Sequence, residues 1–134
     1  MATTTATITV SSTDLLSDEL ALSTTATLTT AGTATGITGT AGLARKTVSG
    51  GHAQYTLFDG SDYTADKAHK IYLKNTSTTA AEYFLITVNA EDVGRLYAGD
   101  WAFIPWSAHD NDCDIKIDPS ANDMTLEYML LTDD

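Results

Sequence analysis

Apolar and polar residues alternate with a period of two along much of this chain, and helix-like spacing is nearly absent. The alternation is clearest in the second half, where short runs of β-branched and aromatic residues are separated by polar or glycine-containing breaks. Successive side chains of a β-strand point to opposite faces, so the pattern predicts short strands with one buried face. The runs are residues 69–77, 81–89, 96–106, 114–118 and 124–131.

The alternation also predicts which side chains enter the core. In the first run Ile71 and Leu73 are expected to point inward, and in the last run Leu126, Tyr128 and Leu130 share one face. With a further strand at residues 54–58 and strands before it, the count reaches about seven or eight. We predict an all-β fold, an antiparallel β-sandwich of jelly-roll type.

The run at residues 96–106 holds both tryptophans of the chain. Trp101 and Phe103 lie two residues apart, share a face and are expected in the core. Pro105 cannot donate to a strand ladder, so this strand ends by Pro105 or lies at a sheet edge. Trp106 then lies at a strand end, where an exposed ring, with Tyr63 as a second candidate, would suit stacking on a sugar.

Residues 1–45 differ from the rest, because Thr, Ala, Ser and Gly dominate and aromatic residues are absent. Residues 5–10 and 21–30 have strand patterns, while residues 14–22 have the only helical pattern, with Asp14 as a candidate cap for one short turn. Such small side chains bury little area, so three fates stay open: a flexible tail, edge strands with long loops, or an arm ordered against another subunit. We divide the chain into residues 1–45, an N-terminal arm or edge strands, and residues 46–134, the β-sandwich domain.

The net charge of −11 is concentrated near the C-terminus. Residues 90–134 carry eleven acidic residues against two bases, whereas the rest of the chain has seven acids and five bases. A negative field disfavours nucleic-acid binding, which needs a basic surface. It favours solubility, and either a basic partner or a bound cation.

Cysteine content and the N-terminal sequence set expectations about location. Cys113 is the single cysteine, so an internal disulfide cannot form. The first residues lack a basic stretch followed by an apolar one, and no stretch approaches the length of a membrane span. We expect synthesis in a reducing cytoplasm and no membrane contact.

A search for chemical sites yields one weak candidate. The loop from Asp110 to Asp118 spaces its carboxylates like the start of a calcium loop, but Ile115 and Ala121 replace the glycine and glutamate that such a loop needs. A solvated turn is the simpler interpretation. The remaining histidines, cysteine and glutamates form no recognised catalytic or zinc pattern, so we expect no catalytic, cofactor-binding or metal residues and no enzyme activity. These residues are His52, His69, His109, Cys113, Glu82, Glu91 and Glu127.

The second half of the chain also resembles a known class of proteins. Leu96-Tyr-Ala-Gly-Asp-Trp-Ala-Phe-Ile-Pro-Trp, then Asp114-Ile-Lys-Ile, then Thr125-Leu-Glu-Tyr-Met-Leu-Leu are similar to small virion proteins of tailed bacteriophages. Among these it most resembles the capsid decoration (cement) proteins of phages that infect cyanobacteria and other marine bacteria. The resemblance covers roughly residues 69–131, and its motifs are loose strand patterns.

This resemblance implies a β-sandwich on the outside of a phage head, bound to the major capsid protein, often as a homotrimer. It also implies that residues 1–45 form an arm along the shell, a role that fits their composition. A carbohydrate- or receptor-binding module of a phage particle is the alternative, and a tail or neck position stays open. The first interpretation predicts an arm that contacts other subunits, and the second predicts an exposed aromatic platform.

Overall fold

The computed structural model describes residues 3–109 and 113–133, and it is an all-β fold of antiparallel strands. The strands of this part of the chain are β1 (Thr4–Ser12), β2 (Leu20–Leu28), β3 (Gly39–Thr40), β4 (Ala44–Val48), β5 (Tyr55–Phe58), β6 (His69–Asn75), β7 (Tyr83–Val88), β8 (Glu91–Tyr97), β9 (Trp101–Trp106), β10 (Ile115–Pro119) and β11 (Met124–Thr132). One 3₁₀ turn, η1 (Gly60–Asp62), follows β5. Within residues 3–109 and 113–133, no helix is long and apolar enough to span a membrane.

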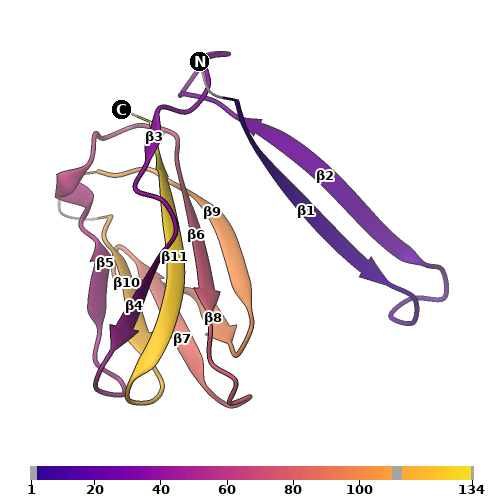
Figure 1. Ribbon diagram of the computed structural model, residues 1–134, viewed down its shortest axis with the longest axis vertical. Coiled ribbons are helices and arrows are strands. Elements are labelled where there is room, and N and C mark those ends of the chain that lie inside the picture. Colours follow the sequence, from indigo (N-terminus) through magenta and orange to yellow (C-terminus); the bar gives the residue numbers. More distant parts are fainter. Residues whose placement is uncertain (1–2, 110–112, 134) are drawn as a thin grey trace.

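Two sheets form the sandwich, and a third stands apart from it (Figure 1). One large sheet has the order β5-β10-β7-β8, and the other has the order β3-β11-β6-β9, with β4 also paired to β11. The predicted all-β antiparallel sandwich is therefore confirmed, with more strands than the seven or eight expected. The finer jelly-roll connectivity stays a prediction.

The main core lies between the two large sheets and draws on both. All but one of its fully buried apolar side chains come from four central strands; these are Ile71, Leu73, Phe84, Ile115, Ile117 and Leu126, and the exception is Ala108 after β9. The predicted inward positions of Ile71 and Leu73 are confirmed. Alternation on β6 has a direct cause, because the inner face of its sheet packs against apolar side chains of the other sheet, while its outer face is only half-buried.

A tight hairpin explains a strand that the sequence pattern did not reveal. Asn89 and Ala90 both have positive φ, 52° and 61°, and Val88 pairs with Glu91 across them. A two-residue loop with two positive φ angles matches the twist of the flanking strands. The chain therefore returns at once as β8, an edge strand with few buried residues, and then turns at Gly99 to enter the other sheet.

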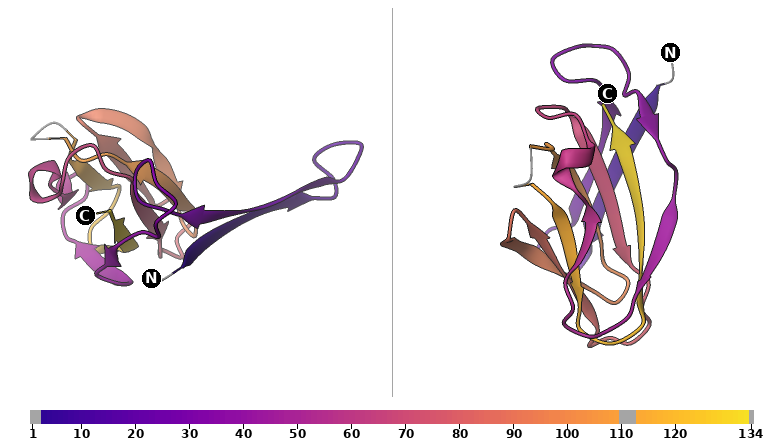
Figure 2. Two further views of the ribbon diagram at one scale, coloured as in Figure 1. Left: turned by 90° about the horizontal axis from the view of Figure 1, so that it is seen from above. Right: turned by 90° about the vertical axis from the view of Figure 1, so that its left-hand side faces the viewer.

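The third sheet is a long two-stranded hairpin, β1 and β2, which leaves the sandwich obliquely and which we call the arm (Figure 1). Seen from above, it reaches well out to one side of the sandwich (Figure 2). The predicted strands at residues 5–10 and 21–30 match these two strands closely. The predicted helical turn at residues 14–22 is wrong, because residues 13–18 are bends and β2 begins at Leu20.

The segment assigned to residues 1–45 contributes to the sandwich as well as the arm. After the arm, β3 pairs with the end of β11, and β4 pairs with its beginning, so both lie along one side of that strand. The boundary between residues 45 and 46 stays a prediction.

Candidate functional site

The arm has one apolar face and one hydroxyl face. Its register is regular, with Ala6 opposite Ala26 and Val10 opposite Leu22, so paired residues share a face. The apolar face carries Ala6, Ile8, Val10, Leu20, Leu22, Ala26 and Leu28, together with the polar residues Thr4, Ser12 and Thr24. The other face is mostly Thr and Ser, and on it the Thr7 and Thr25 hydroxyls are hydrogen-bonded at 2.7 Å.

Of the seven apolar residues on this face, only Leu28 is buried; Val10, Leu22 and Ala26 are exposed, and the other three are half-buried. Val10 and Leu22 are exposed, although both are large and apolar. Only the base of the arm is packed, where buried Leu28 joins Ile37 and Leu131, and Ala6 lies against this small cluster. A two-stranded hairpin is at best marginally stable alone in water, so a second surface over this face would stabilise it. The arm is therefore a candidate contact element.

The tip of the arm, residues 13–19, is ordered around one hydroxyl. Ser12 Oγ accepts the Leu15 backbone N–H at 3.1 Å and donates to Asp14 Oδ1 at 3.0 Å. Leu15 is 72% exposed and Leu16 is 58% exposed, side by side in the turn. Asp14, Asp18 and Glu19 flank them, and the tip has no basic residue. The tip thus presents two leucines surrounded by carboxylates.

A groove of about 400 Å³ lies between the arm and the outer face of the five-stranded sheet. The arm lines it with the small or apolar residues Ala6, Thr7 and Ile8, and the sheet lines it with Tyr72, Lys74, Trp101 and Phe103. Trp101 is 50% exposed and lies at the sheet edge, because β9 pairs only with β6 in the described structure. The groove is therefore mainly aromatic, with one ammonium group on its wall.

A row of charged residues crosses the sheet beside this groove. The pairings place Arg45, Glu127, Lys74 and Trp101 in one line across four strands. Arg45 Nη2 lies 3.0 Å from Glu127 Oε2, and the Tyr72 hydroxyl donates to Glu127 Oε1 at 3.2 Å. Hydrogen bonds from Arg45 lower the pKa of Glu127 below its usual value. Burial raises the pKa of the Tyr72 phenol, and the hydrogen bond to Glu127 raises it further.

A buried carboxylate fixes the base of the arm. Asp133 is buried, and its Oδ2 accepts the Ala31 N–H at 2.8 Å and the Ala68 N–H at 3.0 Å. The Asp133 N–H donates to His69 Nδ1 at 3.1 Å, and the other ring nitrogen lies 3.0 Å from the Thr64 carbonyl. His69 therefore carries its proton on Nε2 and donates it to that carbonyl. The hydrogen bond from Ala68, and less strongly the one from Ala31, lowers the pKa of Asp133.

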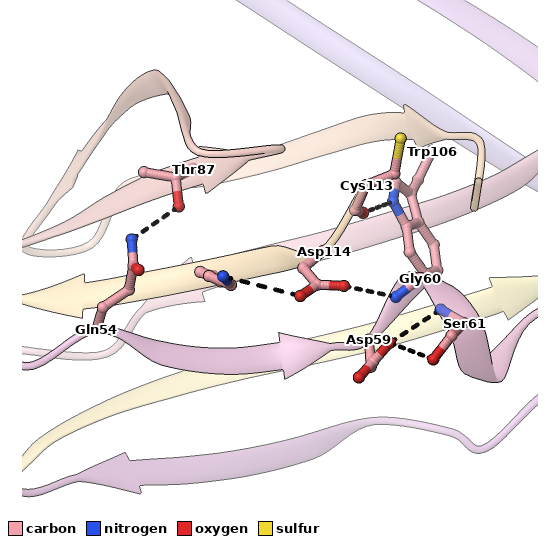
Figure 3. A network of polar contacts seen from close by, with 9 residues as sticks. Gln54, Asp59, Gly60, Ser61, Thr87, Trp106, Cys113 and Asp114 are labelled. Atoms are coloured by element: carbon pink, nitrogen blue, oxygen red, sulfur yellow. Dashed lines mark hydrogen bonds and ion pairs between the residues drawn. The ribbon is translucent and has the colours of Figure 1, made fainter. Parts of the chain in front are cut away.

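The two tryptophans occupy the reverse of their predicted positions. Trp106 is only 4% exposed and donates its indole N–H to the Cys113 carbonyl at 2.8 Å (Figure 3). Its ring packs against Phe58, Tyr63 and His69. The exposed sugar-stacking ring considered at Trp106 is therefore wrong, and Tyr63, the second candidate, is half-buried. The expectation that Trp101 is in the core is also wrong, because it is 50% exposed on the outer face of the sheet. Phe103 lies on the same face and packs against the small cluster of Leu28, Ile37 and Leu131, outside the main core. Pro105 lies in an edge strand, as predicted.

The candidate cation loop lies partly outside the described residues, at 110–112. Of the residues that are described, Asp114 accepts the Gly60 N–H at 2.9 Å and lies 3.8 Å from Lys116 Nζ (Figure 3). Asp118 is half-buried, and its Oδ1 has no hydrogen-bond partner within the described structure. No group of three or more His, Cys, Asp or Glu that could hold a metal occurs among residues 3–109 and 113–133.

The structure places the other candidate catalytic or metal-binding residues in different parts of the fold. His109 is exposed near Asp66, at 3.9 Å, and His52 lies in a turn with positive φ. Glu82 accepts a hydrogen bond from Ser77, and Glu91 is exposed at the start of β8. The charged groups around the groove and the arm are therefore the better candidates for a binding role.

Comparison of the chain with protein-family models, with curated proteins and with solved structures finds no match. The candidate site thus depends on the geometry described above. Sequence reasoning missed the tip, the groove and Asp133. A signal for the tip was present in its two adjacent leucines between acidic residues. The groove and the Asp133 contacts join segments that are far apart in the chain, and no local pattern marks them.

Proposed function

We propose that this protein is a virion structural protein, a capsid decoration (cement) protein that binds the outer surface of a phage head and stabilises it. The projecting arm is the observation that carries the proposal. It is a projecting hairpin with a partly uncovered apolar face, joined to a sandwich that has its own core. Such an element suits contact with a neighbouring protein surface more than it suits folding of its own domain.

The proposed mechanism is stabilisation by binding. A protein that binds the assembled shell, and not the separated subunits, shifts the equilibrium toward the shell by mass action. In this role the protein acts by binding and needs no catalytic residues. Its partner is the major capsid protein, its own copies associate as a trimer, and its place is the capsid exterior after synthesis in the host cytoplasm. The assignment also follows the resemblance of the strand patterns in residues 69–131 to those of decoration proteins.

Head binding tests the proposal directly. Heads assembled from the major capsid protein of the same phage genome are mixed with the protein, sedimented, and assayed for bound protein and for thermal stability. The test variant shortens the arm by replacing residues 9–23 with an Asn-Gly turn, which closes the hairpin where Ile8 pairs with Thr24. Leu43→Ser is the matched control, because it removes an exposed leucine outside the arm.

The wild type and Leu43→Ser are expected to bind the heads and to raise their melting temperature. The arm-shortened variant is expected to keep the sandwich, as judged by circular dichroism, and to lose head binding. Equal binding by the shortened variant would remove the arm from the mechanism. Failure of the wild-type protein to bind any head would remove the decoration function itself.

The alternative, a carbohydrate- or receptor-binding module, has one observation in its favour. The Trp101 ring is half exposed beside Tyr72 and Lys74, and an aromatic face with nearby polar groups suits a sugar ring. This function predicts glycan binding by the wild-type protein that Trp101→Ala abolishes. It also predicts that the arm-shortened variant still binds the glycan through the wall formed by the sheet.

A further inference from the structure

We propose that the groove beneath the arm is the docking site for the arm tip, residues 13–19, of a second copy of this chain. The groove is the aromatic one lined by Tyr72, Lys74, Trp101 and Phe103. The contact requires no phage head, so its test is separate from the test of the proposed function. In this contact the tip of one copy and the groove of another bind each other, so no other protein is needed.

The apolar parts of the two surfaces match. The tip exposes Leu15 and Leu16 as a pair, with more than half of each side chain in water. The groove offers the half-exposed Trp101 ring and the half-buried Phe103 ring on one wall. Leucine side chains that enter an aromatic groove remove apolar area from water on both partners. A buried tryptophan at the centre of a contact is also a typical source of binding energy.

The same chain already shows that the two faces are compatible. At the base of the arm, Ala6 and Leu28 of the apolar face belong to the cluster that includes Phe103 and Met129 of the sheet's outer face. The groove begins where this packing ends, farther along the same two faces. The tip of a second copy would therefore extend the apolar packing that already exists between the arm base and the outer face of the sheet.

The charges are complementary as well. The tip carries the carboxylates of Asp14, Asp18 and Glu19 and no basic group. On the sheet, Lys70 and Lys74 lie on either side of Tyr72 along β6, and both point to the outer face that holds the groove. Lys74 makes no ion pair within the described residues. Its charge helps to lower the pKa of Glu127, but the ion-pair partner of Glu127 is Arg45. A carboxylate from an incoming tip would give Lys74 a partner.

The tip cannot reach the groove of its own chain. The groove is walled by Ala6, Thr7 and Ile8, and β1 continues from there to Ser12 away from the sandwich (Figures 1 and 2). A nine-residue strand spans about 30 Å. The arm is therefore long enough to reach a neighbour and too straight to fold back on itself.

Because tip and groove are different surfaces, the contact takes one of two closed forms. Two copies can exchange tips reciprocally, or several copies can pass tip to groove around a ring, of which a trimer is one case. Both forms fill every groove with a tip. Both also predict that one tip-deficient copy and one groove-deficient copy still form one good contact when mixed.

The test is the mass of the full-length protein in solution over a range of concentrations, measured by sedimentation velocity. The double variant Leu15→Ser, Leu16→Ser removes the two exposed leucines of the tip. Trp101→Ala removes the largest aromatic ring of the groove. Leu43→Ser is again the matched control for an exposed leucine. The wild type and the control are expected to form the same oligomer, and the tip and groove variants to dissociate at least about tenfold more readily.

Two further experiments identify the residues that form the contact. A photo-reactive amino acid at position 101 is expected to cross-link to peptides from residues 13–19, and mixed isotope-labelled copies show whether the two belong to different chains. Lys74→Glu is expected to weaken association, and mixing it with a copy carrying Asp14→Lys and Asp18→Lys is expected to restore it.

Several results would overturn the proposal. A wild-type protein that is monomeric at every concentration has no such contact. An oligomer that persists in the leucine double variant, or weakens equally in the Leu43 control, is held elsewhere. Cross-links within one chain only would place the tip on its own sheet. A monomeric protein that binds an oligosaccharide through Trp101 would show that the groove is a carbohydrate site and not the docking site of the tip.

Discussion

Removal of the Asp133 carboxylate is expected to loosen the base of the arm while the core of the sandwich stays in place. The carboxylate is buried and holds two backbone N–H groups from separate segments, Ala31 after the arm and Ala68 before β6. Asp133→Ala leaves both donors without this acceptor. Asp133→Asn keeps an oxygen that can accept them but removes the charge. The pair of variants separates the hydrogen bonds from the charge.

The structure gives the size of each effect. Ala68 is half-buried and Ala31 is exposed, so water can replace part of the lost hydrogen bonding, and Asp133→Ala is expected to lower the free energy of unfolding by about 1–3 kcal/mol. Asp133→Asn exchanges charge-assisted hydrogen bonds for neutral ones, and its expected cost is about 1–2 kcal/mol. Urea unfolding measures the total. Hydrogen exchange at the amides of Ala31 and Ala68 shows whether the loss is local to the arm base.

The pH dependence of stability shows whether the charge of Asp133 stabilises the folded protein. The pKa of Asp133 is lowered in the folded protein, so its contribution is present above its unfolded pKa, near 3.8, and is lost as the pH falls through the folded value. At low pH the protonated acid resembles the amide of Asp133→Asn. The difference in unfolding free energy between wild type and Asp133→Asn should therefore shrink below about pH 4. A difference that stays constant from neutral to acid pH would refute the role of the charge.

The exchange data provide a second refutation. If Asp133→Ala lowers the unfolding free energy but Ala31 exchanges no faster than in the wild type, the carboxylate does not hold the arm base. If Ala31 exchanges faster and Phe84, in the core, is unchanged, the loosening is local.

Three further predictions test other parts of the description. Trp106→Ala is expected to lower the free energy of unfolding by about 3–5 kcal/mol, and Trp101→Ala by less than about 1 kcal/mol, because only the first ring is buried; urea unfolding of both compares them directly. Gly99→Ala is expected to cost about 1–2 kcal/mol in the same assay, since φ is 83° there and no atom lies within 4 Å of an added Cβ, which leaves backbone strain as the whole cost. Glu127→Gln is expected to lower the pKa of the Tyr72 phenol toward its ordinary value without reaching it, because burial, the larger cause, stays; alkaline absorbance titration measures this, with Tyr72→Phe to identify the signal among the six tyrosines.

Period-two alternation predicted the strands whose two faces differ in burial. On β6 the buried residues alternate with half-buried ones along its whole length, and the prediction for Ile71 and Leu73 was right. On β8 most residues are exposed on both faces, so the strand has no apolar periodicity to detect. Its existence depends on the Asn89 and Ala90 hairpin, and alanine is an unusual residue at positive φ.

The two tryptophans show why face assignment failed on β9. Trp101 and Trp106 are five residues apart, so within one strand they must point to opposite faces. The aromatic pair at 101 and 103 favoured the wrong choice. The pairing with β6 decides it, because Ala102 and Ile104 lie opposite Leu73 and Ile71 and therefore share the inner face. That pairing is a long-range contact, and the strand's own sequence does not encode it.

The separation between core and arm supports a binding role for the arm more strongly than its shape does. The main core cluster takes its described buried residues from Val48 onward, and the arm enters only the small cluster of Leu28, Ile37 and Leu131. The sandwich therefore buries its apolar residues with little help from the arm. The hairpin contributes little to its own core and leaves Val10 and Leu22 exposed to water, and exposed apolar surface of this kind is what the proposed contacts with another molecule would bury.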